Sequence, residues 1–187
     1  MIGFQHFDES ARLALTRGTQ MARGRSPHVT SRHILAACIE DEAVIALLGD
    51  VGISAGKLRE RIVPPQQDVP ALLQSIGLDV DEIRRRLPRA GHSTPTLRLR
   101  RSLNRPLRVS MEGTGGSIRF AESGRKVLEV AVWNARRHGR VVSPLDLIRG
   151  VISDGGDPVN AEISAAARSG TFWPLTHELA RLDAISL

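Results

Sequence analysis

The sequence predicts an all-α, pseudo-twofold helical bundle of about eight to ten helices, and two observations carry this prediction. First, the chain repeats itself without a gap at an offset of 113 residues, so that Phe7 meets Phe120 and Leu15 meets Leu128. Second, apolar residues recur at helical spacing in both copies, and neither copy contains a convincing alternating strand. The two copies are therefore expected to form related helical units that share a core.

The composition narrows the class of protein. A chain of 187 residues that is 41% hydrophobic and 25% charged suits one globular domain and argues against disorder. Its single cysteine excludes an intramolecular disulfide and a cysteine-rich metal site. No apolar run approaches the ~18 residues of a membrane span, and the start of the chain lacks the pattern of a signal peptide. We expect a cytoplasmic protein without a membrane partner.

The first repeat is assigned to residues 4–63. Phe7, Leu15 and Ala22 keep one face of a long helix, and an apolar helix follows a joint at Thr30. The repeat closes with a short helix, a glycine at position 52 that can end it in the left-handed region, and a second helix. A second copy of this closing half predicts an extra helix pair at 69–88.

The middle of the chain, residues 89–117, is rich in helix breakers and forms an arginine-rich insertion. Nine arginines and no acid lie between Arg84 and Arg108. Alternation at 97–100 and 107–109 favours a small β-hairpin that turns near residues 104–106, and a disordered loop is an equal alternative.

The second repeat is assigned to residues 118–169. Val127, Leu128 and Ala131 keep the apolar face of its long helix. Ser143 as N-cap and Asp146 three residues later predict the start of its next helix. A C-terminal helical tail is assigned to 170–187, with Trp173 docking its helix onto the body.

Both repeats carry motifs of a known family. Residues 7–15 and 120–128 are similar to Phe-Thr-x-x-Ala-(Arg/Lys)-x-x-Leu, and residues 29–35 echo Ile-Gly-Thr-Glu-His-Leu-Leu. In these motifs, over about 130 residues, the chain resembles the Clp N-terminal domain, the double-repeat helical module that precedes the ATPase rings of Clp unfoldases. No Gly-x-x-x-x-Gly-Lys-(Ser/Thr) motif occurs, so the resemblance is to a stand-alone N-domain.

The resemblance implies a non-catalytic module that binds proteins or peptides. Its implied partners are Clp unfoldase and protease components, adaptors, client peptides and cyclic peptide ligands. The family uses the surface near the repeat starts, which points to Phe4, Phe7 and Phe120 as binding residues with Arg125 as a polar rim. The alternative is that Phe7 and Phe120 only pack on the following helical turn.

The family's phosphoarginine-binding glutamate is absent from both repeats. Arg32 and Leu145 stand at its two positions. An arginine there would repel a guanidinium group, so phosphoarginine binding at these positions is not expected.

No catalytic residue, metal or cofactor is predicted. The six histidines show no His-x-x-x-His spacing, and His33 fits a structural role at a helix N-terminus. Cys38 lies in an apolar run and is expected to be a buried core residue. The glycines at 113–116 lack the lysine of a phosphate-binding loop.

A second functional hypothesis concerns the basic segment. In this hypothesis the chain is a nucleic-acid-associated regulator, and the arginines of the insertion neutralise phosphates. The same residues could instead form a solvated arm or a seat for an acidic protein partner. They form the predicted basic partner surface: Arg98, Arg100, Arg101, Arg105 and Arg108.

Overall fold

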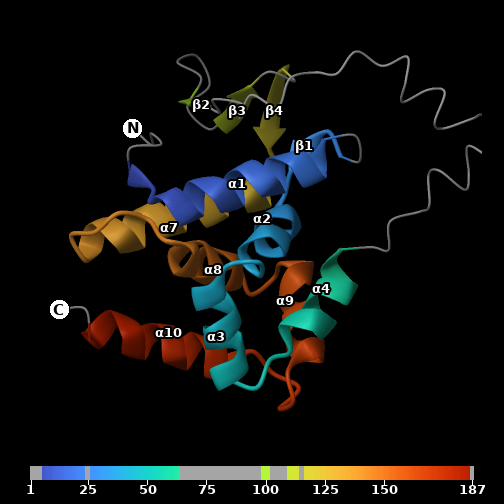
Figure 1. Cartoon of the computed structure of the whole chain (residues 1–187), viewed down its shortest axis with the longest axis vertical. Helices are drawn as coiled ribbons and strands as arrows, with labels where there is room; N and C mark the ends of the chain where they lie inside the picture. Colours follow the sequence, from blue (N-terminus) through green and yellow to red (C-terminus); the bar gives the residue numbers. More distant parts are fainter. Residues whose placement is uncertain (1–5, 24–25, 64–97, 102–108, 114–115, 186–187) are drawn as a thin grey trace, which may run out of the picture.

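The computed structural model describes residues 6–23, 26–63, 98–101, 109–113 and 116–185. These residues form eight helices and one small four-stranded sheet (Figure 1). The predicted all-α bundle is therefore confirmed, and the eight helices of the described residues agree with the expected eight to ten. The expected extra helix pair at 69–88 lies outside the described residues.

The first half of the bundle contains four helices: α1 (Glu9–Ala22), α2 (Ser31–Cys38), α3 (Glu42–Asp50) and α4 (Ala55–Ile62). Asp8 begins α1 by accepting a hydrogen bond of 2.7 Å from the Ala11 amide. Gly52 follows α3 with a φ of 73°, which is the left-handed conformation that its place in the sequence predicted.

The second half repeats this order with α7 (Glu122–Arg137), α8 (Pro144–Ile152), α9 (Pro158–Ala166) and α10 (Trp173–Ile185). The predicted capping box of Ser143 and Asp146 starts α8. Leu175 and Leu179 are buried and dock α10 onto the body, whereas Trp173 is 70% exposed. The sequence prediction that Trp173 docks this helix was therefore wrong.

The sheet runs in the order β1-β4-β3-β2 at one end of the molecule (Figure 1), from β1 (His28–Val29), β2 (Arg98–Arg101), β3 (Val109–Gly113) and β4 (Gly116–Phe120). β2 and β3 pair antiparallel, as the hairpin alternative predicted, and the expected turn lies outside the described residues. β1 and β4 were not foreseen. β1 has only two residues, too few for alternation to show.

The backbone pairing between the halves follows the sequence repeat. Phe7 forms a parallel bridge with Val142, and Val29 pairs in parallel with Phe120. In each pair, a residue at the start of one repeat meets a residue just before the second helix of the other repeat. Phe120 lies 113 residues after Phe7, and Val142 lies 113 residues after Val29, so the two pairs are equivalent under the sequence repeat. This exchange gives direct evidence of the pseudo-twofold duplication.

The centre of the bundle is formed by α2 and α8, which contact each other. α1 packs on α2 and α7 packs on α8, while α4 contacts α9 and α10 contacts α3 from the other half (Figure 1). Leu15, Leu128 and Ile148 are completely buried in the shared apolar core. Within the described part of the chain, no helix combines the length and apolar character needed to cross a membrane.

Candidate functional site

The two phenylalanines predicted to bind partners lie in the core. Phe7 is 1% exposed and Phe120 is 8% exposed, so neither presents a surface to a partner. The reason is the pairing between the halves, which fixes both residues beneath the other repeat. Arg125 is mostly buried, with its Nε 4.0 Å from Glu129 Oε1. Phe4 lies outside the described residues.

The predicted basic surface is described only in its backbone and only in part. Arg98, Arg100 and Arg101 belong to β2, which ends the strand order of the sheet. Arg105 and Arg108 lie outside the described residues. β2 thus places three arginine positions along one sheet edge.

The residues given structural roles from sequence keep them. His33 Nδ1 lies 3.2 Å from the Thr30 amide and completes a capping box at the start of α2. Cys38 is fully buried, and this burial raises the pKa of its thiol. Arg32, at one of the family's glutamate positions, lies 3.3 Å from Glu162 of the other half.

An open groove of about 590 Å³ lies in the second half, with α7 on one side, α10 on the other and α8 at its base. Val130, Trp133 and Arg137 contribute from α7, one helical turn apart. Leu179 and Ala180 face them from α10. Trp133 is 61% exposed, and its ring centroid lies 5.5 Å from the guanidinium carbon of Arg137.

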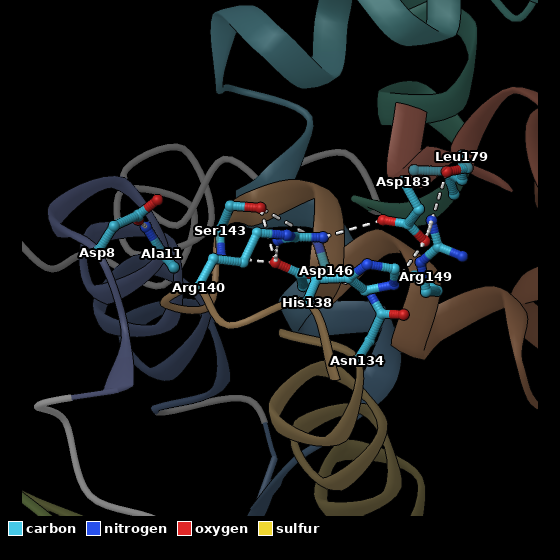
Figure 2. A network of polar contacts seen from close by, with 10 residues as sticks. All are labelled: Asp8, Ala11, Asn134, His138, Arg140, Ser143, Asp146, Arg149, Leu179 and Asp183. Carbon is cyan, nitrogen blue, oxygen red and sulfur yellow. Dashed lines mark hydrogen bonds and ion pairs between the residues drawn. The ribbon is translucent and has the colours of Figure 1, made fainter. Parts of the chain in front are cut away.

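A chain of alternating charges runs beside this groove (Figure 2). The buried carboxylate of Asp146 accepts hydrogen bonds from Arg140 and Asn134. Arg140 then reaches Asp183 of α10 at 3.0 Å, and Arg149 lies 2.6 Å from the same carboxylate. Two carboxylates are thus balanced by two guanidinium groups, which fixes α10 to the start of α8.

The charge of Arg140 is stabilised by this arrangement. Burial by itself would lower the pKa of Arg140, but hydrogen bonds and charges from Asp146 and Asp183 raise it. Arg140 is therefore cationic at neutral pH.

Sequence reasoning missed both the groove and the network. Two signals were present in α7. Asn134 interrupts the apolar stripe of Val127 and Ala131, which predicts a buried polar partner. Trp133 lies on the polar face of α7, opposite the apolar stripe, where a large aromatic residue is unusual. Asp183 gave no such signal, because its partners lie 34 and 43 residues away in the sequence.

The groove also gathers unsatisfied polar atoms. Among the described residues, four buried side-chain polar atoms lack a hydrogen-bond partner, and three of these belong to residues that line the groove. They are His138 Nδ1, Arg149 Nε and Thr176 Oγ1. Unpaired buried polar atoms are uncommon in folded proteins and need an explanation.

A second cavity, of about 600 Å³, is lined by more acidic than basic residues, in contrast to the groove between α7 and α10. It lies where the start of α1 meets the starts of α3 and α8, and Asp8, Asp41 and Glu42 contribute to its wall. Burial is the main cause that raises the pKa of Asp8. Across the described ranges, no group of three or more His, Cys, Asp or Glu side chains is arranged to hold a metal ion.

The fold and the groove define a duplicated helical bundle with an aromatic, partly charged groove in its second half. No family model matches the chain, and no curated protein matches it. A solved structure from preliminary structural investigations of a malarial protein secretion system is similar over 97% of each chain, with a TM-score of 0.59 and 19% sequence identity. At this identity the similarity concerns the fold alone.

Proposed function

We propose that this chain is a non-catalytic protein- or peptide-binding module that modulates, or supplies clients to, a Clp protease system. The observation that carries the binding role is the groove between α7 and α10, with Trp133 exposed on its wall. Its volume of about 590 Å³ lies within the range of typical ligand sites. Because the groove is open, it suits a peptide segment better than an enclosed small molecule.

Trp133 has the properties of an interface anchor. Tryptophan offers a large, rigid apolar surface and is enriched among the residues that dominate binding energy. The neighbouring Val130 and Leu179 supply further apolar surface in the same groove. Trp133 thus continues into the apolar lining of the groove, and a contiguous apolar surface of this kind is typical of an interaction site.

The polar groups of the groove support binding and not catalysis. His138 Nε2 lies 3.7 Å from Asp183, which resembles the base and orienting acid of a hydrolase. However, His138 Nδ1 has no hydrogen-bond partner, and the hydroxyl of Ser153 donates to the Arg149 carbonyl at 2.6 Å. Within the described part of the chain, no hydroxyl or thiol forms a hydrogen bond with His138.

The link to a Clp system rests on the repeat motifs together with the duplicated helical fold. The motifs at Phe7 and Phe120 resemble those of Clp N-terminal domains, and these two residues occupy matching places in the two halves. The buried position of both phenylalanines assigns them to the stability of the bundle. Partner binding is assigned here to the groove of the second half.

A pull-down from native lysate tests the proposal. The wild-type chain and Trp173→Ala should enrich Clp unfoldase components, adaptors or clients, whereas Trp133→Ala should lose them. Trp173 is a matched control because it is 70% exposed and does not line the groove. Enrichment that is the same with Trp133→Ala, or absent altogether, would contradict the proposal.

A salt titration distinguishes the nucleic-acid hypothesis from the protein-binding proposal. Binding to DNA that falls steeply with salt, and is abolished by replacing the five arginines of the basic surface, would support that hypothesis. The surface is the one named from sequence: Arg98, Arg100, Arg101, Arg105 and Arg108.

A further inference from the structure

The groove of the second half has a smaller counterpart in the first half, and the two differ in charge. The counterpart measures about 270 Å³ and is lined by residues that include Met21 of α1, Ala36 of α2 and Ile62 of α4. At the repeat offset of 113 residues, Met21 corresponds to Asn134 and Ala36 corresponds to Arg149. At these two positions the second groove is polar and basic where the first is apolar. The first groove also has Arg32 on its wall, but this arginine is paired with Glu162 of the other half.

Among the described residues that line the second groove, Arg137 is a cation without an ion-pair partner. The titratable residues that line it are Arg137, His138, Arg149 and Asp183. The Asp183 carboxylate is balanced by Arg149 and Arg140, so it contributes little net charge. Arg137 is exposed, forms no ion pair with any described residue and stacks on Trp133.

The polar atoms beside the groove are mainly hydrogen-bond donors. Arg149 Nε carries a hydrogen and can only donate, and the Thr176 hydroxyl can donate as well. Both atoms are buried, so the exposed guanidinium of Arg137 is the donor that an occupant reaches. Carboxylate oxygens are the acceptors that match a guanidinium group.

We propose that the groove between α7 and α10 binds a short acidic peptide segment, with an apolar side chain against Trp133 and an Asp or Glu carboxylate beside Arg137. This inference rests on the proposed function and names the chemistry of its partner. The acidic cavity near Asp8 and Asp41 would repel the same segment, so charge directs it to this groove. The groove of the first half is less suited to this segment, because its lining arginine, Arg32, is already paired with Glu162 at 3.3 Å.

The test begins with a random decapeptide library displayed on phage. The full chain serves as bait, and Trp133→Ala serves for counter-selection. We expect the selected peptides to combine Leu or Phe with an excess of Asp or Glu. Trp133-dependent peptides without that excess would overturn this inference and leave the proposed function standing. If no selected peptide depends on Trp133, the proposed role of the groove in partner binding is contradicted as well.

A titration then measures the role of charge. In a Trp173→Phe background, Trp133 is the only tryptophan, and its emission reports binding in the groove. Replacing the acids of a selected peptide by Asn and Gln should weaken binding about tenfold, and the difference should shrink at high salt. Equal affinity of the acidic and amide peptides would overturn the inference.

Two charge reversals complete the test. Arg137→Glu should remove the preference for the acidic peptide. Arg136→Glu is the matched control, because Arg136 is exposed on the same helix but does not line the groove. If both variants weaken the acidic peptide equally, the effect comes from the net charge of the chain, and the carboxylate is not bound beside Arg137.

Discussion

Asn134 of α7 donates a hydrogen bond of 2.8 Å to the buried carboxylate of Asp146 in α8. The same carboxylate accepts from the amide and the hydroxyl of Ser143 at 2.9 Å each, and from Arg140. Asp146 thus acts in three ways at once: it caps its own helix, satisfies a polar residue in the α7 stripe and balances an arginine. In the first half the equivalent capping position is His33, which places an imidazole where the second half has a carboxylate.

The first prediction concerns this carboxylate. Asp146→Asn removes the negative charge that balances Arg140 while keeping the size of the side chain. Arg140 keeps Asp183 as a partner at 3.0 Å and is 30% exposed, so the main loss is that of the charge-assisted hydrogen bonds to the buried carboxylate. We therefore expect a loss of about 1–3 kcal/mol in the free energy of unfolding. Urea unfolding followed by circular dichroism measures it.

Asp154→Asn provides the comparison for this variant. Asp154 pairs with Lys126 at 3.1 Å, but both side chains are at least one-third exposed. An exposed pair of this kind contributes no more than about 1 kcal/mol. A loss of stability that is equally small at position 146 would contradict the role assigned to the network.

The second prediction concerns the contact of α7 with α8. A Cβ atom at Gly150 would lie 2.4 Å from the carbonyl oxygen of Val127, so Gly150→Ala forces the two helices apart. We expect a loss of about 1–3 kcal/mol in the free energy of unfolding. Gly49→Ala is the control, since a Cβ there meets nothing within 4 Å and alanine favours the helix. Equal thermal stability of the two variants would show that the helices do not pack this closely.

The third prediction separates the core phenylalanines from the groove. Phe7→Ala should lower the free energy of unfolding by about 3–5 kcal/mol, because the side chain is 1% exposed. Trp133→Ala should change it by about 0.5 kcal/mol or less, as expected for an exposed position. Thermal denaturation of both variants measures the difference in stability. A Phe7→Ala variant as stable as the wild type would show that Phe7 is not part of the core.

The helices of the fold could be predicted because the sequence signals for them are local or repeated. The capping box at Ser143, the left-handed Gly52 and the offset that joins Phe7 to Phe120 are all visible in the sequence. Helical periodicity and capping act within a few residues, so they do not depend on knowing the tertiary structure.

The candidate site could not be predicted in the same way. Phe7 and Phe120 were expected to bind partners because the family that the repeats resemble uses the surface near its repeat starts. Their burial depends on pairing with Val142 and Val29 in the opposite repeat. The groove likewise needs Asp183 to meet Arg140 and Arg149, and long-range ion pairs leave no periodic trace in a sequence.

The last prediction concerns Asp8, whose carboxylate caps α1 and faces the acidic cavity. Burial is the main cause that raises its pKa above the usual 3.8; the Ala11 amide lowers it, and the charges of Asp41 and Asp146 raise it further. The folded state therefore binds the Asp8 proton more tightly than the unfolded state does. The resulting contribution to stability is present below pH 3.8 and is lost as the pH rises through the higher pKa of the folded state.

Two variants separate the charge of Asp8 from its capping role. Asp8→Asn keeps an acceptor for the Ala11 amide and removes the half-buried charge, so it should be at least as stable as the wild type at neutral pH. Asp8→Ala removes the cap as well and should lose about 1 kcal/mol. An NMR titration of the Asp8 carboxyl carbon should give a midpoint above 3.8; a midpoint at or below that value would mean that the capping hydrogen bond outweighs the effect of burial.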